Sequence, residues 1–379
     1  MKKRILLYST RTPKSNVNAD GGASTALNII ESLYKDCILD VAFLNLDNQT
    51  FIDKRVNKVF PYDAELIGDK FQSIADKRII NKVVLKDYRN YDLIIVLHIS
   101  GLMGLEDYDD DFWNRVVLYP MFLTPSYIKS GETVPTYYTE AEKKTFSKIK
   151  KVITPSTIEK EEIVNIYGVD ELKIKVIPRG VSHVFEYNPC PIIDKKNINI
   201  CMVGSIKKQK NYLRALKVIK ILKDLNINPT FHIVGSIQDE IVYQSLVKYI
   251  SENGLNNNVV FHFTISQMKL NKLFKKCHIA ISSSNWETFG RGIYEGIHSG
   301  KPTFIFFSLE EVRKFVGESS VLYYCDDELD MAKKIIYLID NYSSLARVFE
   351  SEFLRISSLV SIEKEEDELK KVLLGWCQS

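Results

Sequence analysis

Hydrophobic and polar positions follow a repeating order along this chain: a short apolar run, a few turn-forming residues, then a longer stretch with helical periodicity. A short apolar run that ends in small or turn-forming residues is typical of a buried parallel strand. Strands that alternate with helices favour a parallel, doubly wound α/β sheet. In the first half of the chain, the predicted strands are residues 5–9, 39–44, 92–98, 116–119 and 152–154.

The second half of the chain restarts the same order after a break. Residues 186–197 are rich in Asn, Pro, Asp and Lys, which is typical of an interdomain linker. We therefore predict a Rossmann-like domain over residues 1–185, a second one over residues 198–355, and a C-terminal helix within residues 356–379. The strands predicted for the second domain are residues 198–203, 230–234, 259–263, 277–282, 303–307 and 321–324.

Length and composition agree with two globular domains. The chain has 379 residues, which is long for one compact domain, and 45% of them are hydrophobic and 26% charged. A net charge of +3 is too small to imply nucleic-acid binding. Six scattered cysteines without a Cys-x-x-Cys pair predict neither a zinc site nor a disulfide framework, which fits a reducing cytoplasm.

Contact with a membrane is expected to be peripheral at most, because no window offers the ~20 apolar residues of a membrane helix. Lysines cluster within residues 143–151, where they could meet phosphates or anionic lipid at the inner face of a membrane. A solvated helix face explains that cluster equally well. The sequence gives no sign of an oligomeric state.

The strongest candidate for a functional site is the segment Glu287-Thr-Phe-Gly-Arg-Gly-Ile-Tyr-Glu295, which follows a predicted strand and opens a helix. Backbone N–H groups at such a turn attract phosphate. Nearby carboxylates do not favour phosphate, but they suit hydroxyl groups. Phosphate and hydroxyls together describe a nucleotide sugar. The alternative is a surface helix that carries two solvated glutamates.

Two carboxylates with Phe-Gly between them, followed by Gly300-Lys301-Pro302 and an apolar strand, resemble the retaining glycosyltransferases of the group 1 family (family 4). The passage Lys173-Ile-Lys-Val-Ile-Pro-Arg-Gly-Val181 is also similar to that family, although Arg179 replaces the usual Asn. The resemblance covers nearly all of the chain. It implies the GT-B fold, with two Rossmann-like domains facing across a cleft and a C-terminal helix that crosses back onto the first domain.

The resemblance also implies roles for residues of the second domain, which should hold the donor. Glu287 should contact hydroxyls of the donor sugar, and Glu295 should bind the ribose hydroxyls, since an ionised carboxylate is a pure acceptor. Lys210 lies six positions after Gly204, where the family places its phosphate-binding lysine. The backbone N–H groups that should face the diphosphate or sugar belong to Phe289, Gly290 and Arg291.

The chain departs from the family pattern at two positions of this site. Ser205 stands where the family usually has an arginine directly after the glycine, so one expected cation is missing. Arg291 stands where the family usually has an apolar residue. Arg291 could supply the missing charge, or it could contact an acidic sugar or the acceptor.

The first domain should hold the acceptor. Gly21 and Gly22 match the family's glycine loop, which lets the backbone approach the diphosphate and sugar. His98 ends a predicted strand at the edge where sites form, and it could bind sugar, assist the reacting hydroxyl or simply cap the strand. Residues 119–132 are rich in aromatic and turn residues and are predicted to form an acceptor loop, although packing alone could explain the aromatic rings.

These expectations together describe a retaining, metal-independent glycosyltransferase without a cofactor. Its donor would be a nucleoside-diphosphate sugar, with a UDP-sugar as the default, and its acceptor a glycan or lipid-linked hydroxyl in bacterial cell-surface polysaccharide assembly. No metal site is predicted, because the acidic run that starts at Asp109 is typical of a solvated loop.

Two other classes of protein remain as alternatives. One is a GT-B nucleotide-sugar epimerase, which the passage that ends at Val181 and the segment from Glu287 to Glu295 argue against. The other is a non-catalytic relative that binds a partner transferase, which the intact Lys210 and both glutamates oppose.

Overall fold

The computed structural model describes residues 2–10, 12–13, 21–45, 50–63, 71, 73–192, 194 and 196–377. The chain divides into two compact units. Unit 1 consists of residues 1–178 with 363–379, and unit 2 consists of residues 179–362. The sequence placed the corresponding boundaries near residues 185 and 355.

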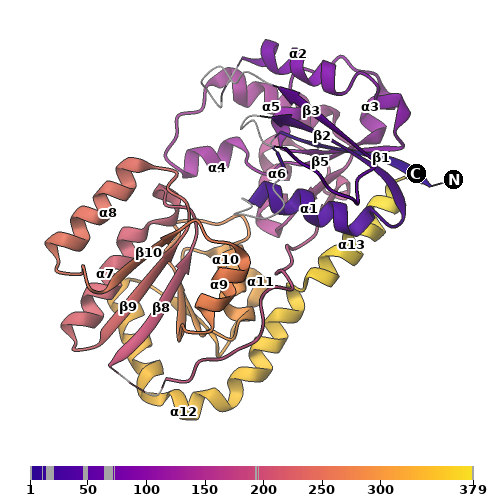
Figure 1. The fold of residues 1–379 in the computed structure, drawn as a ribbon. Coiled ribbons are helices and arrows are strands. Elements are labelled where there is room, and N and C mark those ends of the chain that lie inside the picture. Colours follow the sequence, from indigo (N-terminus) through magenta and orange to yellow (C-terminus); the bar gives the residue numbers. More distant parts are fainter. Residues whose placement is uncertain are drawn as a thin grey trace. The chain divides into compact units, whose positions relative to one another are not determined.

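Unit 1 is built on a seven-stranded sheet in the order β3-β2-β1-β4-β5-β6-β7 (Figure 1). Every neighbouring pair in it is parallel. The strand order reverses between β1 and β4, and loops at such a switch point form ligand sites in open α/β sheets. The strands are β1 (Lys3–Ser9), β2 (Cys37–Asn45), β3 (Lys58–Asp63), β4 (Leu93–Leu97), β5 (Val116–Tyr119), β6 (Val152–Thr154) and β7 (Ile174–Val176).

Helices cover both faces of this sheet because its strands are apolar on both sides. Ile5 and Leu7 of β1 belong to one core, and Leu6 and Tyr8 belong to the other. The helices of unit 1 are α1 (Gly21–Leu33), α2 (Ile74–Val84), α3 (Asp110–Arg115), α4 (Thr124–Lys129), α5 (Thr136–Lys148), α6 (Thr157–Tyr167) and α13 (Ile362–Trp376), with 3₁₀ turns η1 (Tyr88–Asn90), η2 (Ile99–Gly101) and η3 (Glu171–Lys173).

The C-terminal helix α13 packs onto unit 1, as predicted. Leu369 and Leu373 are fully buried in the core that contains α1. The Asn28 amide donates to Glu365 at 2.7 Å, and Lys370 pairs with Asp36 at 2.7 Å. None of the helices that the structure describes is long and apolar enough to cross a membrane.

Unit 2 has a six-stranded parallel sheet in the order β10-β9-β8-β11-β12-β13, whose order reverses between β8 and β11. Helices lie on both sides of it (Figure 1). The prediction of two doubly wound parallel sheets is therefore confirmed. The strands are β8 (Asn197–Val203), β9 (Asn228–Val234), β10 (Val259–Phe263), β11 (Ile279–Ser282), β12 (Thr303–Phe306) and β13 (Leu322–Cys325). The helices are α7 (Tyr212–Asp224), α8 (Glu240–Glu252), α9 (Gln267–Phe274), α10 (Arg291–His298), α11 (Glu310–Val316) and α12 (Glu328–Leu359), with a 3₁₀ turn η4 (Lys208–Lys210).

Candidate functional site

The loop after β8 and the loop after β11 lie side by side at the switch point of unit 2. The Ser283 hydroxyl bonds to the carbonyl oxygens of Lys210 and Asn211, at 3.0 and 2.9 Å. The backbone N–H of Asn285 donates to the Gln209 carbonyl at 2.8 Å, and the Gln209 side chain returns a bond to the Trp286 carbonyl at 3.0 Å. These bonds join segments about 75 residues apart, so they fix the loop geometry before any ligand arrives.

Lys210 and Glu287 form an ion pair at the centre of these loops. The Lys210 ammonium lies 2.5 Å from Glu287 Oε1, and the Ser284 hydroxyl donates to the same oxygen at 2.6 Å. Only 17% of the Lys210 side chain and 10% of the Glu287 side chain are exposed. The sequence predicted both residues for the site but did not identify Ser284, whose only signal is a small polar residue just after a strand.

Glycines allow the backbones around this pair to approach closely. A side-chain Cβ at Gly204 would lie 3.0 Å from Lys210 Cε. A Cβ at Gly235 would lie 1.9 Å from the Gly204 carbonyl oxygen. Gly292, in the first turn of α10, has room for no side chain either, since its Cβ would lie 2.9 Å from the Val203 carbonyl oxygen. The start of α10 is thereby held against the end of β8.

Helix α10 begins at Arg291 and carries the second candidate carboxylate. Gly290 precedes it with a left-handed backbone (φ 84°), which glycine adopts without strain. Arg291 and Glu295 are one turn apart on the helix, and Arg291 Nε lies 3.5 Å from Glu295 Oε1. Burial raises the pKa of Glu295, and the charges of Arg291 and Lys210 oppose that rise.

Phe289 and Ser205 complete the set of residues predicted in this unit. The Phe289 side chain is buried and packs on Tyr294 and Phe315, with ring centroids 4.7 and 5.7 Å away. Its ring therefore supports the turn, and only its backbone is suited to a ligand. Ser205 is half-buried in the loop after Gly204.

In unit 1, the predicted residues lie at the switch point between β1 and β4. Helix α1 begins at Gly21 and includes Gly22, a few residues before the start near Ser24 that the sequence suggested. His98 follows β4, and its Nδ1 accepts from the Ser100 backbone N–H at 3.2 Å. In the neutral ring this places the proton on Nε2.

Two strained residues stand at neighbouring strand ends of this unit. His98 has φ 84° and Met121 has φ 65°, values that non-glycine residues rarely adopt. The His98 backbone N–H bonds to the Tyr119 carbonyl at 2.8 Å, which links the two loops. Strain of this kind costs about 1–3 kcal/mol per residue and is concentrated at functional sites. Sequence reasoning missed Met121, because no residue type there signals a left-handed backbone.

The aromatic residues of the predicted acceptor loop pack on one another and on aromatic rings from outside the loop. Tyr127 is buried, and its ring contacts Phe122 and Phe71 at centroid distances of 4.6 and 5.0 Å. Phe71 in turn packs on Tyr138 at 5.0 Å. Packing therefore accounts for these rings.

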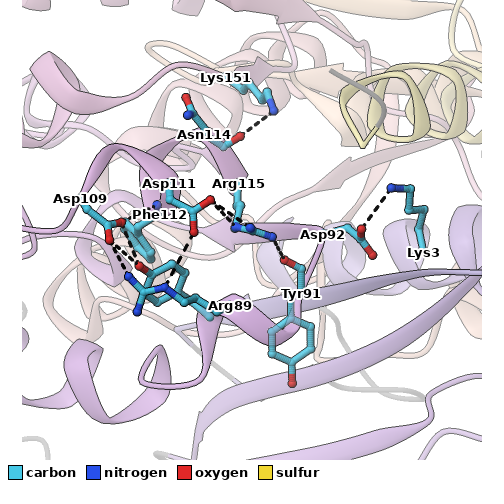
Figure 2. A network of polar contacts seen from close by, with 11 residues as sticks. Lys3, Arg89, Tyr91, Asp92, Asp109, Asp111, Phe112, Asn114, Arg115 and Lys151 are labelled. Atoms are coloured by element: carbon cyan, nitrogen blue, oxygen red, sulfur yellow. Dashed lines mark hydrogen bonds and ion pairs between the residues drawn. The ribbon is translucent and has the colours of Figure 1, made fainter.

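The acidic run that starts at Asp109 is held in a network of polar contacts (Figure 2). Asp109 caps α3 by accepting from the Phe112 N–H at 2.9 Å, and Arg89 pairs with it at 2.6 Å. Asp111 pairs with Arg115 at 2.9 Å. Among the described residues, no group of three or more His, Cys, Asp or Glu side chains is placed to hold a metal ion.

Comparisons with known proteins agree with this architecture. Residues 188–352 match the family described as glycosyl transferases group 1. The chain is 28% identical over 212 residues to an uncharacterized 41.2 kDa protein in the cps region of Klebsiella pneumoniae. That match covers 51% of this chain and 54% of the relative, about half the length of each.

Many solved structures resemble the chain, and two of them illustrate the match over almost its whole length. Sucrose-phosphate synthase from Thermosynechococcus elongatus has a TM-score of 0.77 at 14% identity, and 98% of each chain is covered. Anabaena Alr3699/HepE, in complex with UDP and glucose, has a TM-score of 0.71 at 16% identity, with 98% of this chain and 100% of that chain covered. The predicted GT-B fold is confirmed.

Proposed function

We propose a retaining, metal-independent glycosyltransferase that uses a nucleoside-diphosphate sugar, on the premise that residues 188–352 match the glycosyl transferases group 1 family. One observation carries the proposal. Two cations and two carboxylates, which are Lys210, Arg291, Glu287 and Glu295, form ion pairs at the carboxyl ends of β8 and β11. Cations suit the diphosphate of such a donor, and carboxylates suit its hydroxyl groups.

The donor would lie over these loops in a defined order. The start of α10 offers backbone N–H groups and a positive dipole to the diphosphate. Glu295 would accept the ribose hydroxyls, and Glu287 would accept hydroxyls of the transferred sugar. Lys210 would lie against the leaving diphosphate, where an ammonium offsets the negative charge that develops as the bond to the sugar breaks.

The anomeric configuration of the sugar is retained if the acceptor attacks the anomeric carbon from the same face that the diphosphate leaves. The bond between the anomeric carbon and the phosphate oxygen breaks, and a bond to the acceptor oxygen forms. The acceptor proton passes to the leaving phosphate oxygen. The protein then contributes orientation and charge stabilisation, and Lys210 and the backbone N–H groups take the role that a metal ion has in other transferases.

The comparisons support a UDP-sugar and a cell-surface product. Anabaena HepE was solved with UDP and glucose, and the Klebsiella pneumoniae relative is named for a cps region. We propose a cytoplasmic enzyme of polysaccharide assembly whose acceptor is a glycan or lipid-linked hydroxyl, with any membrane contact peripheral. His98 and the glycine loop at Gly21 would face that acceptor from unit 1.

Donor hydrolysis tests the proposal. The full chain is incubated with a panel of UDP-, GDP-, ADP- and dTDP-sugars, with and without EDTA. We expect release of nucleoside diphosphate from one class of donor, unaffected by EDTA, with a first-formed sugar of unchanged anomeric configuration by NMR. Glu287→Gln should reduce the rate, whereas Glu252→Gln on α8 should not.

Each other outcome overturns part of the proposal. Epimerised nucleotide sugar without diphosphate release would indicate an epimerase. Tight donor binding without turnover would indicate a non-catalytic protein. Inverted product or loss of activity with EDTA would refute the retaining or the metal-independent mechanism.

A further inference from the structure

Each candidate cation of the donor site is already paired with a candidate carboxylate. Lys210 lies against Glu287, with 17% and 10% of the two side chains exposed. Arg291 lies against Glu295, with 29% and 7% exposed. Neither pair belongs to a purely structural position, since all four side chains lie in the two loops at the switch point and in the helix that follows.

We propose that these two ion pairs make the site selective for ligands that carry a diphosphate and hydroxyl groups together, an inference that rests on the proposed donor site. A diphosphate can draw a cation away from its carboxylate. The carboxylate then needs a new donor, and ribose or sugar hydroxyls supply one. A nucleotide sugar therefore exchanges both partners of each pair, and a ligand with only one kind of group cannot.

Burial decides how strongly a partial ligand is rejected. If pyrophosphate took Arg291 alone, Glu295 would remain buried and ionised without its partner, which is costly in a poorly hydrated site. If a nucleoside took Glu295 alone, Arg291 would be freed, but its more exposed side chain can be hydrated. We therefore expect the site to discriminate more strongly against pyrophosphate than against a nucleoside.

The same reasoning applies to the second pair with a smaller effect. Glu287 keeps the hydrogen bond from Ser284 at 2.6 Å when Lys210 leaves it. A diphosphate that takes Lys210 thus leaves a carboxylate that is only partly unsatisfied. Arg291, which is absent from the usual family pattern, accounts for most of the selectivity.

The test is a substitution that should change the affinities for pyrophosphate and for a nucleoside diphosphate in opposite directions. Glu295→Gln removes the charge that holds Arg291 but keeps the size of the side chain. We expect this variant to bind pyrophosphate about 5- to 10-fold more tightly than the wild type, because Arg291 is released. The same variant should bind nucleoside diphosphate about 10-fold or more weakly, because the ribose contact is lost. Isothermal titration calorimetry of the full chain with pyrophosphate and with UDP, GDP, ADP and dTDP measures both effects.

A matched control excludes a general charge effect. Glu252→Gln changes the net charge equally and removes an exposed i,i+4 partner of Lys248 at the C-terminal end of α8, far along the chain from both loops. It should leave both affinities unchanged. Arg291→Leu should weaken nucleoside diphosphate binding without any gain for pyrophosphate. If Glu295→Gln does not fold, Glu287→Gln replaces the ion pair with Lys210 by a weaker, neutral hydrogen bond and gives a smaller gain of the same sign.

Two outcomes separate the inference from the proposed function. If the wild type binds a nucleoside diphosphate but Glu295→Gln shows no gain for pyrophosphate, the ion-pair inference is overturned and the donor site stands. If the wild type binds none of the four nucleoside diphosphates, the proposed function itself falls.

Discussion

The ion pair between Lys210 and Glu287 should stabilise unit 2, and breaking it from either side should be costly. Both side chains are mostly buried, so removal of one partner leaves a poorly hydrated charge. Breaking a fully buried pair costs about 3–5 kcal/mol. Here the residual exposure and the Ser284 hydroxyl reduce the cost, and we expect about 2–3 kcal/mol for Lys210→Met. Glu287→Gln should cost about 1–2 kcal/mol, because the amide oxygen still accepts from Lys210 and Ser284.

The double variant Lys210→Met with Glu287→Gln should be more stable than the sum of the single variants implies. It removes both charges together, so no uncompensated ion remains, and we expect a coupling free energy of about 2 kcal/mol. Urea unfolding of the full chain gives the four free energies. Hydrogen-exchange mass spectrometry of peptides from β8 and β11 assigns the transition to unit 2.

A second cycle on α7 provides the control. Lys220 and Asp224 also form an ion pair at 2.6 Å, but their side chains are 30% and 58% exposed. Exposed i,i+4 pairs are worth about 0.3–0.5 kcal/mol, so this cycle should show little coupling. Additive effects at Lys210 and Glu287, or single variants more stable than the wild type, would refute the reasoning.

Three further predictions concern stability. Burial lowers the pKa of His232 to about 4, below the value of 6.5 in an unfolded chain. As the pH falls, the unfolded state therefore binds a proton before the folded state does, and unit 2 loses stability. We expect urea unfolding to show a loss of about 1 kcal/mol between pH 7 and pH 5, a figure that allows for the partial exposure of His232. His232→Asn should flatten that slope, and an unchanged slope would contradict this role of His232. Gly235→Ala should destabilise unit 2 by about 3 kcal/mol or more, because the new Cβ would lie 1.9 Å from the Gly204 carbonyl oxygen. Calorimetry measures this effect, and an unchanged unfolding transition would mean that the loops shift freely. Asp109→Ala should cost unit 1 about 1–2 kcal/mol through loss of the α3 cap, and equal stability by circular dichroism would contradict that role.

The sheets could be predicted from the sequence because their central strands are buried on both faces. Runs such as residues 93–97 are apolar at every position, which few other structures require. Strand β3 was missed for the opposite reason. Its sequence contains Lys58, Pro61 and Asp63, and it lies at the edge of the sheet, where β2 is its only partner strand among the residues that the structure describes. Edge strands therefore lack the continuous apolar run on which the prediction depended.

The positions of the site residues could also be predicted, since the carboxyl ends of parallel strands gather at one edge. The contacts that these residues make with one another could not be predicted. Lys210 and Glu287 are 77 residues apart, and the contact depends on how two irregular loops fold over each other. Ser284 and the left-handed backbone of Met121 likewise arise from local loop geometry, which leaves no periodic signal in the sequence.

Arg291 is the instructive exception, because its partner was within reach of sequence reasoning. Once the helix is known to begin at Arg291, Glu295 follows four positions later and lies on the same face. With the helix taken to start further on, Arg291 belongs to a loop and looks like a spare cation for phosphate. The residue at which a helix starts thus changes the role inferred for a side chain, from a cation that is available to phosphate to one half of an ion pair. If Arg291 contacts the diphosphate as proposed, it binds phosphate most readily when another donor satisfies Glu295, and the ribose hydroxyls of a nucleotide sugar are the groups that could do so.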